Sequence, residues 1–235
     1  LAIALQEGRI RLGAGSNVNE VYELLFRSVY GRTYSGGLTH PALGAISEED
    51  FLALLADVAM LAWHGNGRSV QLDMLEVSLK SDVRKLTILK RLSESDAKGV
   101  LNLVTAFYFR RSEDGARGYS TIEFTHRSFR EYLTAVKILD LLRSSAEVLG
   151  GRALLSGTPP ERLALQAWMK VCGRGTWDEY LRAFLLRGLE RIDAALVRQW
   201  KLDIERLLER CVEEACPLEL EYPRLAYFEE LLMAR

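Results

Sequence analysis

The spacing of apolar residues changes twice along the chain, and this change constrains the fold more than any other feature of the sequence. Up to about residue 104, apolar residues recur every three to four positions, as on the buried face of a helix. The pattern then becomes that of two strands, 106–111 and 121–125, joined by the polar turn 112–118. Helical spacing resumes at Arg127. The sequence therefore predicts a mainly α fold that contains one β-hairpin.

Local signals place the helices that precede the hairpin. Asn17, with Glu20 three residues later, forms a capping box before a helix that we expect to end at Gly31. A second helix is expected to begin after Ser47, with acidic residues in its first turn, and to stop at 65–67. Between it and the hairpin we predict a short strand and then three short helices, at 69–71, 72–79, 84–92 and 96–104.

This order of elements, a helix, a short strand, short helices, a hairpin and a closing helix, predicts a winged-helix domain. After breaks at 150–151 and 159–160 the helical pattern returns, with helices expected at 160–172, 176–190, 194–214 and 222–234. Paired helices of this length suit a second helical domain or an α-solenoid. We therefore predict three regions: a helical region over 1–45, a winged helix over 46–145 and a C-terminal helical domain over 146–235.

Composition and charge exclude several classes of protein. The 31 basic and 32 acidic residues leave a net charge of −1, so the chain is neither a polycation nor a polyanion. Its apolar stretches fall short of the ~18 residues that a membrane span requires, so we expect no membrane partner. Three cysteines without zinc-ligand spacing favour a reducing cytoplasmic location. The chain opens without Met or a signal peptide, and we expect it to be an excerpt of a longer protein.

Motifs for catalysis are absent from the sequence. It contains no G-x-x-x-x-G-K-[ST] phosphate loop, no G-x-S-x-G and no H-E-x-x-H. Of the three histidines, His40 lies in a Gly/Pro loop and His64 in the last turn of a predicted helix, where it favours the negative end of the helix dipole. We therefore expect no catalytic residue and no metal site in this chain.

His126 stands out because it lies where a strand turns into a helix. The backbone N–H groups of a first helical turn have no partner within the helix and favour an anion. An imidazole at that junction can donate a hydrogen bond to a phosphate oxygen. The alternative is a partly buried histidine whose hydrogen bonds are satisfied within the protein.

The residues around His126 match a known signature. Phe124-x-His126-x-Ser128-Phe129-x-Glu131-Tyr132-Leu133, with Ala135 beyond it, resembles the F-x-H-x-S-F-x-E-Y-[LF]-x-A signature of the winged-helix domain in NACHT-type STAND ATPases, the NLR-like class. The resemblance implies that His126 contacts the β-phosphate of ADP and so holds the molecule closed. The apolar members of the signature would be packing residues: Phe124, Phe129, Tyr132 and Leu133. Ser128 or Thr125 would cap the helix, and Glu131 would pair locally.

The resemblance also implies what surrounds this chain. Residues 1–45 would end a helical domain that follows a nucleotide-binding domain encoded upstream. That P-loop domain would carry any ATPase activity and most contacts to ADP or ATP with Mg²⁺. A protein or other trigger, sensed through the C-terminal region, would open the switch and drive homo-oligomerisation. Such switches act in bacterial defence signalling, including antiphage immunity.

Two other functions remain open from the sequence. A winged helix can belong to a DNA-binding transcription regulator, and residues 69–111 hold eight basic against five acidic residues, a local net of +3. The candidate recognition helix, 96–104, has a single basic residue and begins with Asp96, so we do not expect nucleic acid as a partner. The second alternative is a nucleotide-independent helical scaffold. In such a scaffold the aromatic residues of the later helices would line a groove for a partner, whereas otherwise they belong to the hydrophobic core. These residues are Trp168, Trp177, Trp200, Tyr180, Tyr222, Tyr227 and Phe228.

Overall fold

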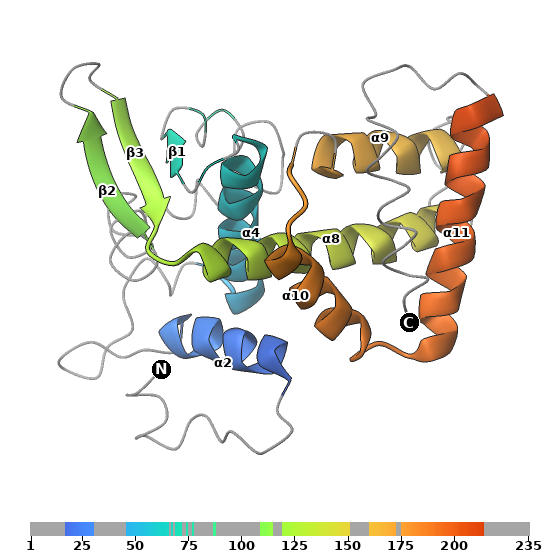
Figure 1. The fold of residues 1–235 in the computed structure, drawn as a ribbon, viewed down its shortest axis with the longest axis horizontal. Coiled ribbons are helices and arrows are strands. Elements are labelled where there is room, and N and C mark those ends of the chain that lie inside the picture. The colour runs from blue at the N-terminus through green and yellow to red at the C-terminus, as the bar shows by residue number, and fades with distance from the viewer. Residues whose placement is uncertain are drawn as a thin grey trace. The chain divides into compact units, whose positions relative to one another are not determined.

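A computed structural model shows a mainly helical protein with one small sheet in its described part (Figure 1), which confirms the predicted mainly α class. The chain divides into two compact units, Leu1–Thr134 and Ala135–Arg235. No helix within the described ranges offers the long apolar stretch that a bilayer crossing requires. The residues that the structure describes are 17–30, 46–65, 67, 69–71, 74, 77, 87, 109–114, 119–150, 160–172 and 175–213.

Within the described residues, the first unit contains two helices, three strands and the start of a third helix. They are α2 (Val18–Tyr30), α4 (Glu48–His64), β1 (Ser69–Gln71), β2 (Phe109–Asp114), β3 (Tyr119–Phe124) and α8 (Arg127–Leu149). The predicted helix starts are confirmed: Asn17 Oδ1 accepts the Asn19 N–H at 2.9 Å, and Ser47 Oγ accepts the Asp50 N–H at 3.0 Å. The helices predicted at 72–79, 84–92 and 96–104 lie outside the described residues, apart from single helical positions at 74, 77 and 87.

The strands form an antiparallel sheet in the order β1-β3-β2. The predicted short strand at 69–71 is confirmed as β1, which pairs with β3 so that Ser69 lies opposite Glu123. The predicted hairpin forms. Its first strand, β2, continues to Asp114 rather than ending at Arg111, and the predicted positions 106–108 lie outside the described residues. Its second strand, β3, begins at Tyr119 rather than at Thr121. The sequence suggested a turn at 112–114 because these residues are polar. They extend the strand because a ladder is held by backbone hydrogen bonds.

Aromatic side chains join α2 to the first turns of α8, which lie side by side in Figure 1. Phe26 is fully buried, and its ring centroid lies 5.7 Å from both the Phe129 and the Tyr132 rings. Tyr22 contacts the same two rings, at 5.9 and 5.2 Å. Offset and edge-to-face ring pairs at such distances stabilise beyond the area they bury. This aromatic cluster therefore holds α2 against the residues that follow β3.

Polar contacts connect α2 to the start of α4. The Arg27 guanidinium donates to Glu48 Oε1 at 2.6 Å and to Glu23 Oε1 at 3.2 Å. The Tyr30 hydroxyl donates to the Ile46 carbonyl at 2.7 Å. The middle of α4 is buried, and Phe51, Leu55 and Trp63 are nearly inaccessible to solvent, so α4 contributes much of the described core of this unit.

The part of the second unit that the structure describes holds the rest of α8 and three further helices. They are α9 (Pro160–Cys172), α10 (Glu179–Leu189) and α11 (Ala194–Glu213). The prediction for 160–172 is confirmed, with Pro160 in the first turn, where its missing N–H costs nothing. α10 begins at Glu179 rather than at 176 because Asp178 caps it, its Oδ1 accepting the Leu181 N–H at 2.9 Å. The helix predicted at 222–234 lies outside the described residues.

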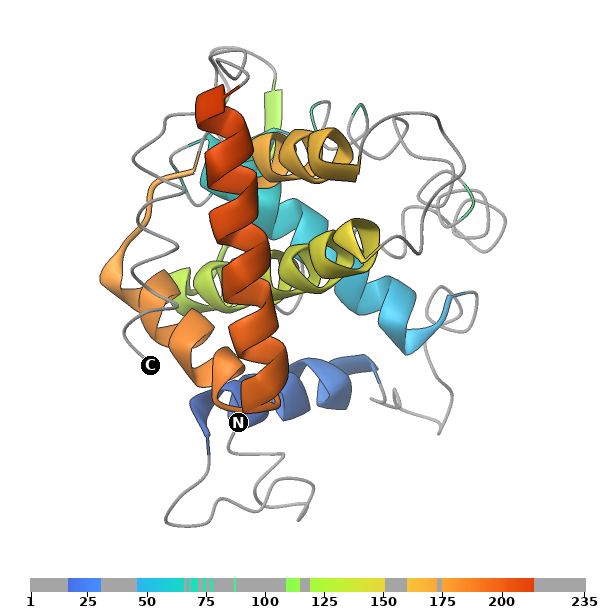
Figure 2. The same ribbon diagram turned by 90° about the vertical axis from the view of Figure 1, so that its right-hand side faces the viewer.

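The core of this unit lies where α11 crosses α9 (Figures 1 and 2). Trp168 of α9 and Trp200 of α11 are each 1% exposed, which confirms that these aromatic residues belong to the core. Arg206 of α11 donates to Glu161 of α9 at 2.5 Å. Tyr180 is half exposed instead, and Tyr222, Tyr227 and Phe228 lie outside the described residues.

Candidate functional site

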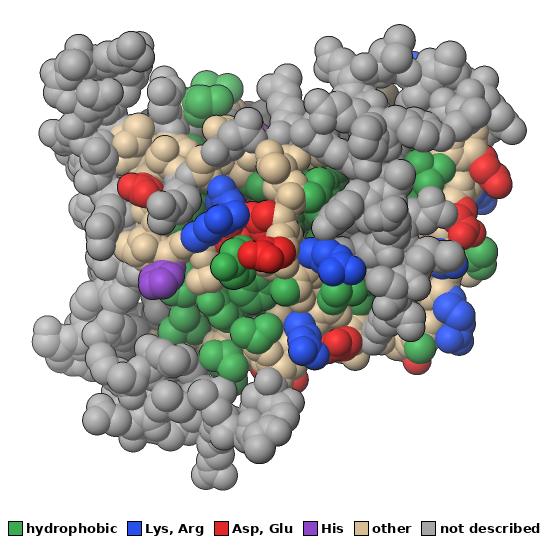
Figure 3. Space-filling model, in the orientation of Figure 1, with side chains coloured by type: hydrophobic (Ala, Val, Ile, Leu, Met, Phe, Trp, Pro, Cys, Tyr) green, Lys and Arg blue, Asp and Glu red, His purple; other side chains and the backbone are tan. Residues whose placement is uncertain are grey.

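His126 lies in a two-residue bend between β3 and α8, and its side chain is exposed to solvent. Its carbonyl accepts the Phe129 N–H at 3.2 Å, a bond that belongs to the first turn of the helix. The structure thus places His126 at the surface rather than partly buried. Figure 3 shows an exposed histidine beside hydrophobic side chains on one face of the molecule.

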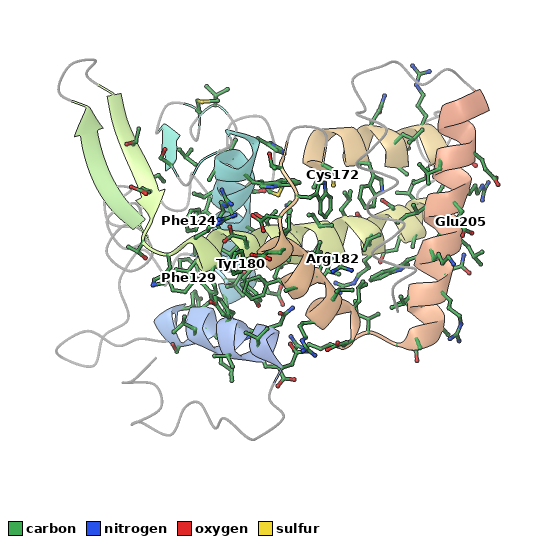
Figure 4. All side chains as sticks on the ribbon, in the orientation of Figure 1. Phe124, Phe129, Cys172, Tyr180, Arg182 and Glu205 are labelled. Carbon is green, nitrogen blue, oxygen red and sulfur yellow. The ribbon has the colours of Figure 1, made fainter. Side chains whose placement is uncertain are left out.

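Aromatic side chains flank the bend on both sides. Phe124 ends β3 and is 1% exposed, and Phe129 lies in the first turn of α8, as Figure 4 shows. The Phe129 ring meets the His126 imidazole edge-to-face, with centroids 5.9 Å apart. Tyr132 and Leu133 are also buried. The packing roles expected for these four residues are confirmed, and the imidazole therefore sits at the solvent-facing edge of an aromatic layer.

Three charged residues follow His126 and pair within the first turns of α8. Glu131, whose side chain is 2% exposed, accepts from Arg127 Nε and from Arg130 Nη2, both at 2.7 Å. Arg130 also donates through Nη1 to the Gly67 carbonyl at 2.5 Å. The local pairing predicted for Glu131 is thus confirmed. Sequence reasoning missed Arg130, and the four-residue spacing of Arg127 and Glu131 was the one signal for this network.

The electrostatic character of this end of α8 favours an anion. The first turn of this 23-residue helix contains no acidic residue, so the positive end of the helix dipole is not neutralised there. The first carboxylate along this helix, Glu131, is held by two guanidinium groups. An exposed imidazole at the same end adds a donor, and these features fit a phosphate oxygen approaching from solvent. The arrangement can bind and orient such a group.

The other sequence-predicted residues lie elsewhere or outside the described part. His64 is in the last turn of α4, as expected, with its ring 5.6 Å from that of Trp63, and Gly65 follows as the C-cap. His40 lies outside the described residues. Capping of α8 by Thr125 or Ser128 stays a prediction. Among the residues that the structure describes, no three His, Cys, Asp or Glu side chains gather in a way that could hold a metal ion.

Comparison of this chain with family models, with curated proteins and with solved structures finds no match.

Proposed function

We propose that this chain is the regulatory part of a bacterial STAND ATPase of the NACHT type. In this proposal it holds an ADP-bound, autoinhibited state and releases it when a trigger is sensed. The observation that carries the proposal is His126, exposed just before α8, in contact with Phe129 and within a signature whose residues Phe124 and Tyr132 are buried. An exposed donor on a buried scaffold is the arrangement expected of a residue that contacts a group bound by another domain.

The described elements also support a winged helix in the first unit. α4 is followed by β1 and, later in the chain, by the β2–β3 hairpin and α8, which is the order that a winged helix requires. The first strand pairs with the second strand of the hairpin, so the three strands form one sheet beside α4. α2, which the aromatic cluster fixes to α8, would then end the helical domain that precedes the winged helix.

In this mechanism the chain's own residues hold the nucleotide's phosphate. The His126 imidazole donates an N–H to a β-phosphate oxygen of ADP, and the first turn of α8 contributes its dipole. A P-loop domain encoded upstream would bind Mg²⁺ and make the other contacts to the nucleotide. Inverting a closed state favoured 99:1 requires about 5.5 kcal/mol of differential binding. One charge-assisted hydrogen bond contributes about 1.5–3 kcal/mol, so His126 would be one part of the latch.

The remaining steps of the proposed switch involve partners of this chain. A protein or other trigger, bound through the C-terminal region, would favour the open state. ATP would then replace ADP, and copies of the protein would assemble into a homo-oligomer. Defence signalling, including antiphage immunity, is the role that we propose for this switch in the cytoplasm.

The first test is to identify what the intact protein carries. The product of the full reading frame is purified under native conditions and denatured, and any released nucleotide is identified by chromatography. The proposal predicts near-stoichiometric ADP. A homogeneous, folded sample without nucleotide would contradict it and would direct the next assays to duplex DNA and to partner proteins.

The second test replaces the histidine itself. His126→Ala in the intact protein should shorten ADP retention and raise basal oligomerisation, because the exposed donor to the phosphate is lost. His64→Ala is the matched control, since His64 lies at the end of α4 in the same unit, and it should leave both properties unchanged. If His126→Ala matches the wild type in ADP release and in oligomeric state, the proposed role of His126 is wrong.

A further inference from the structure

The bend that carries His126 is fixed at both ends to one short segment of the chain. Before the bend, β3 pairs with β1, so that Glu123 lies opposite Ser69. After it, Arg130 of α8 donates to the Gly67 carbonyl, two residues before Ser69. The strand pairing at Glu123 and the Arg130 hydrogen bond thus tie residues 123–130 to the segment 67–69 at two points. His126 lies between these two points.

Arg130 makes the second of these connections with a geometry that only a guanidinium provides. Nη1 donates to the Gly67 carbonyl while Nη2 donates to Glu131 Oε1. Both side chains are buried, with 9% of Arg130 and 2% of Glu131 exposed. The planar fork of an arginine makes two directed hydrogen bonds at once, whereas a lysine ammonium is a point charge on a flexible stem.

Stability alone is a weak reason for such a pair. Removing two charges from water costs several kcal/mol per ion, and apolar residues of similar volume often replace a buried ion pair without loss of stability. A buried pair does fix the relative position of the elements that it joins. Here those elements are the turn after α4 and the first turn of α8, the turn that His126 immediately precedes.

We propose that Arg130 is a positioning residue that holds the His126 bend in place, with Glu131 orienting its guanidinium. The inference rests on the proposed function, because what Arg130 positions is the phosphate contact of His126. It implies that the effect of Arg130 on ADP retention passes through His126, whereas its effect on stability does not. A double-mutant cycle separates these two effects.

The experiment uses the natively purified, ADP-containing intact protein. The rate at which bound ADP is released is measured after addition of excess ATP. The midpoint of thermal unfolding is measured for each variant. The cycle consists of Arg130→Lys, His126→Ala and the double variant. Arg130→Lys keeps the charge beside Glu131 and loses the fork. Arg143→Lys is the matched control, because Arg143 lies on the same helix and makes only a surface pair with Asp140 among the described contacts.

We expect Arg130→Lys to speed ADP release about three- to tenfold when His126 is present and less than about twofold when it is absent. The shift in thermal midpoint should be the same in both backgrounds, and Arg143→Lys should change neither property. If Arg130→Lys does not fold, Glu131→Gln, which weakens the orientation of the fork, should show the same dependence on His126.

The outcomes distinguish the two proposals. Equal acceleration with and without His126 would overturn the positioning role and leave Arg130 a structural residue, with the proposed function intact. Unchanged release in Arg130→Lys would also overturn it. If His126→Ala alone leaves ADP release unchanged, the proposed role of His126 is wrong and this inference fails with it. If no ADP is present, the proposed function fails as well.

Discussion

Replacing Phe26 by alanine removes one of the two rings, with Tyr22, through which α2 contacts the first turns of α8. Phe26 is fully buried, and it meets Phe129 edge-to-face and stacks on Tyr132 with an interplanar angle of 10°. Both partners lie within six residues of His126 along α8. The change therefore tests whether this aromatic cluster stabilises the first unit.

The magnitude follows from burial and from the two ring contacts. Phe→Ala in a close-packed core costs about 3–5 kcal/mol of unfolding free energy. Each ring pair contributes about 0.5–1.5 kcal/mol beyond the area that it buries. Phe26→Leu keeps most of the apolar volume and loses both ring contacts, so it should cost about 1–3 kcal/mol. Leu24 on the same helix is 38% exposed, and Leu24→Ala should cost less than about 1 kcal/mol.

The assay is native-state amide hydrogen exchange, followed by mass spectrometry for peptides from α2 and α4. At about 1.4 kcal/mol per tenfold, Phe26→Ala should speed the slowest exchange in α4 by about two to three and a half orders of magnitude. Phe26→Leu should fall between Phe26→Ala and the wild type. Because small domains are only marginally stable, Phe26→Leu also gives a readable result if the alanine variant unfolds.

Two results would refute this reasoning. The first is a loss of less than about 1 kcal/mol of unfolding free energy for Phe26→Ala, since removal of a fully buried ring from a packed core costs more than that. The second is an equal loss for Leu24→Ala and Phe26→Ala. That outcome would mean that α2 is held by its general apolar surface rather than by the cluster with Phe129 and Tyr132.

The other predictions concern single contacts. Asp178→Ala should destabilise α10 by about 1 kcal/mol, because the cap on the Leu181 N–H is lost, and amide exchange in α10 measures this. Trp200→Ala should lower the free energy of unfolding, measured by urea denaturation, by about 3–5 kcal/mol. Leu202→Ala, at a position 57% exposed, should change it by no more than about 0.5 kcal/mol. Equal losses in the two variants would contradict the assignment of Trp200 to the core. Arg27→Met should cost less than about 1 kcal/mol, and the cost should shrink in 0.5 M salt, because the Arg27 side chain is half exposed; a loss that salt does not change would be unexpected.

Helix boundaries were predictable where a short-range contact sets them. Ser47 and Gly65 bound α4 as the sequence indicated, because a cap involves only residues within one turn. Pro160 marks the start of α9 for the same kind of reason. The start of α10 was predicted three residues too early, at 176. The Asp178 side chain decides the boundary by accepting the Leu181 N–H.

The sheet was predictable in kind and not in register. The period of two predicts two strands joined by a polar turn, but it does not say where the polar end of a hairpin stops pairing. Three polar residues, 112–114, remain in β2. The pairing of β1 with β3 joins segments about fifty residues apart in sequence, and no local pattern encodes it.

The candidate site was predictable as far as its aromatic residues. Phe124 and Tyr132 are apolar positions at strand and helix spacing, and both are buried as expected. Arg130 is a charged residue on a helix, which in sequence suggests a solvated face. Its burial depends on the Gly67 carbonyl, 63 residues away, and on Glu131 beside it. Such a partner is found only after the chain has folded.

The order of the strands also bears on how copies of this protein can avoid aggregating. Within the described sheet, β2 is an edge strand, with a row of backbone groups on its outer side. Such an edge is a template onto which another chain can add a strand. Four of the six residues of β2 are charged: Arg110, Arg111, Glu113 and Asp114. Segments that form amyloid-like strands are typically uncharged, so the charged sequence of β2 makes this strand a poor template for strand addition.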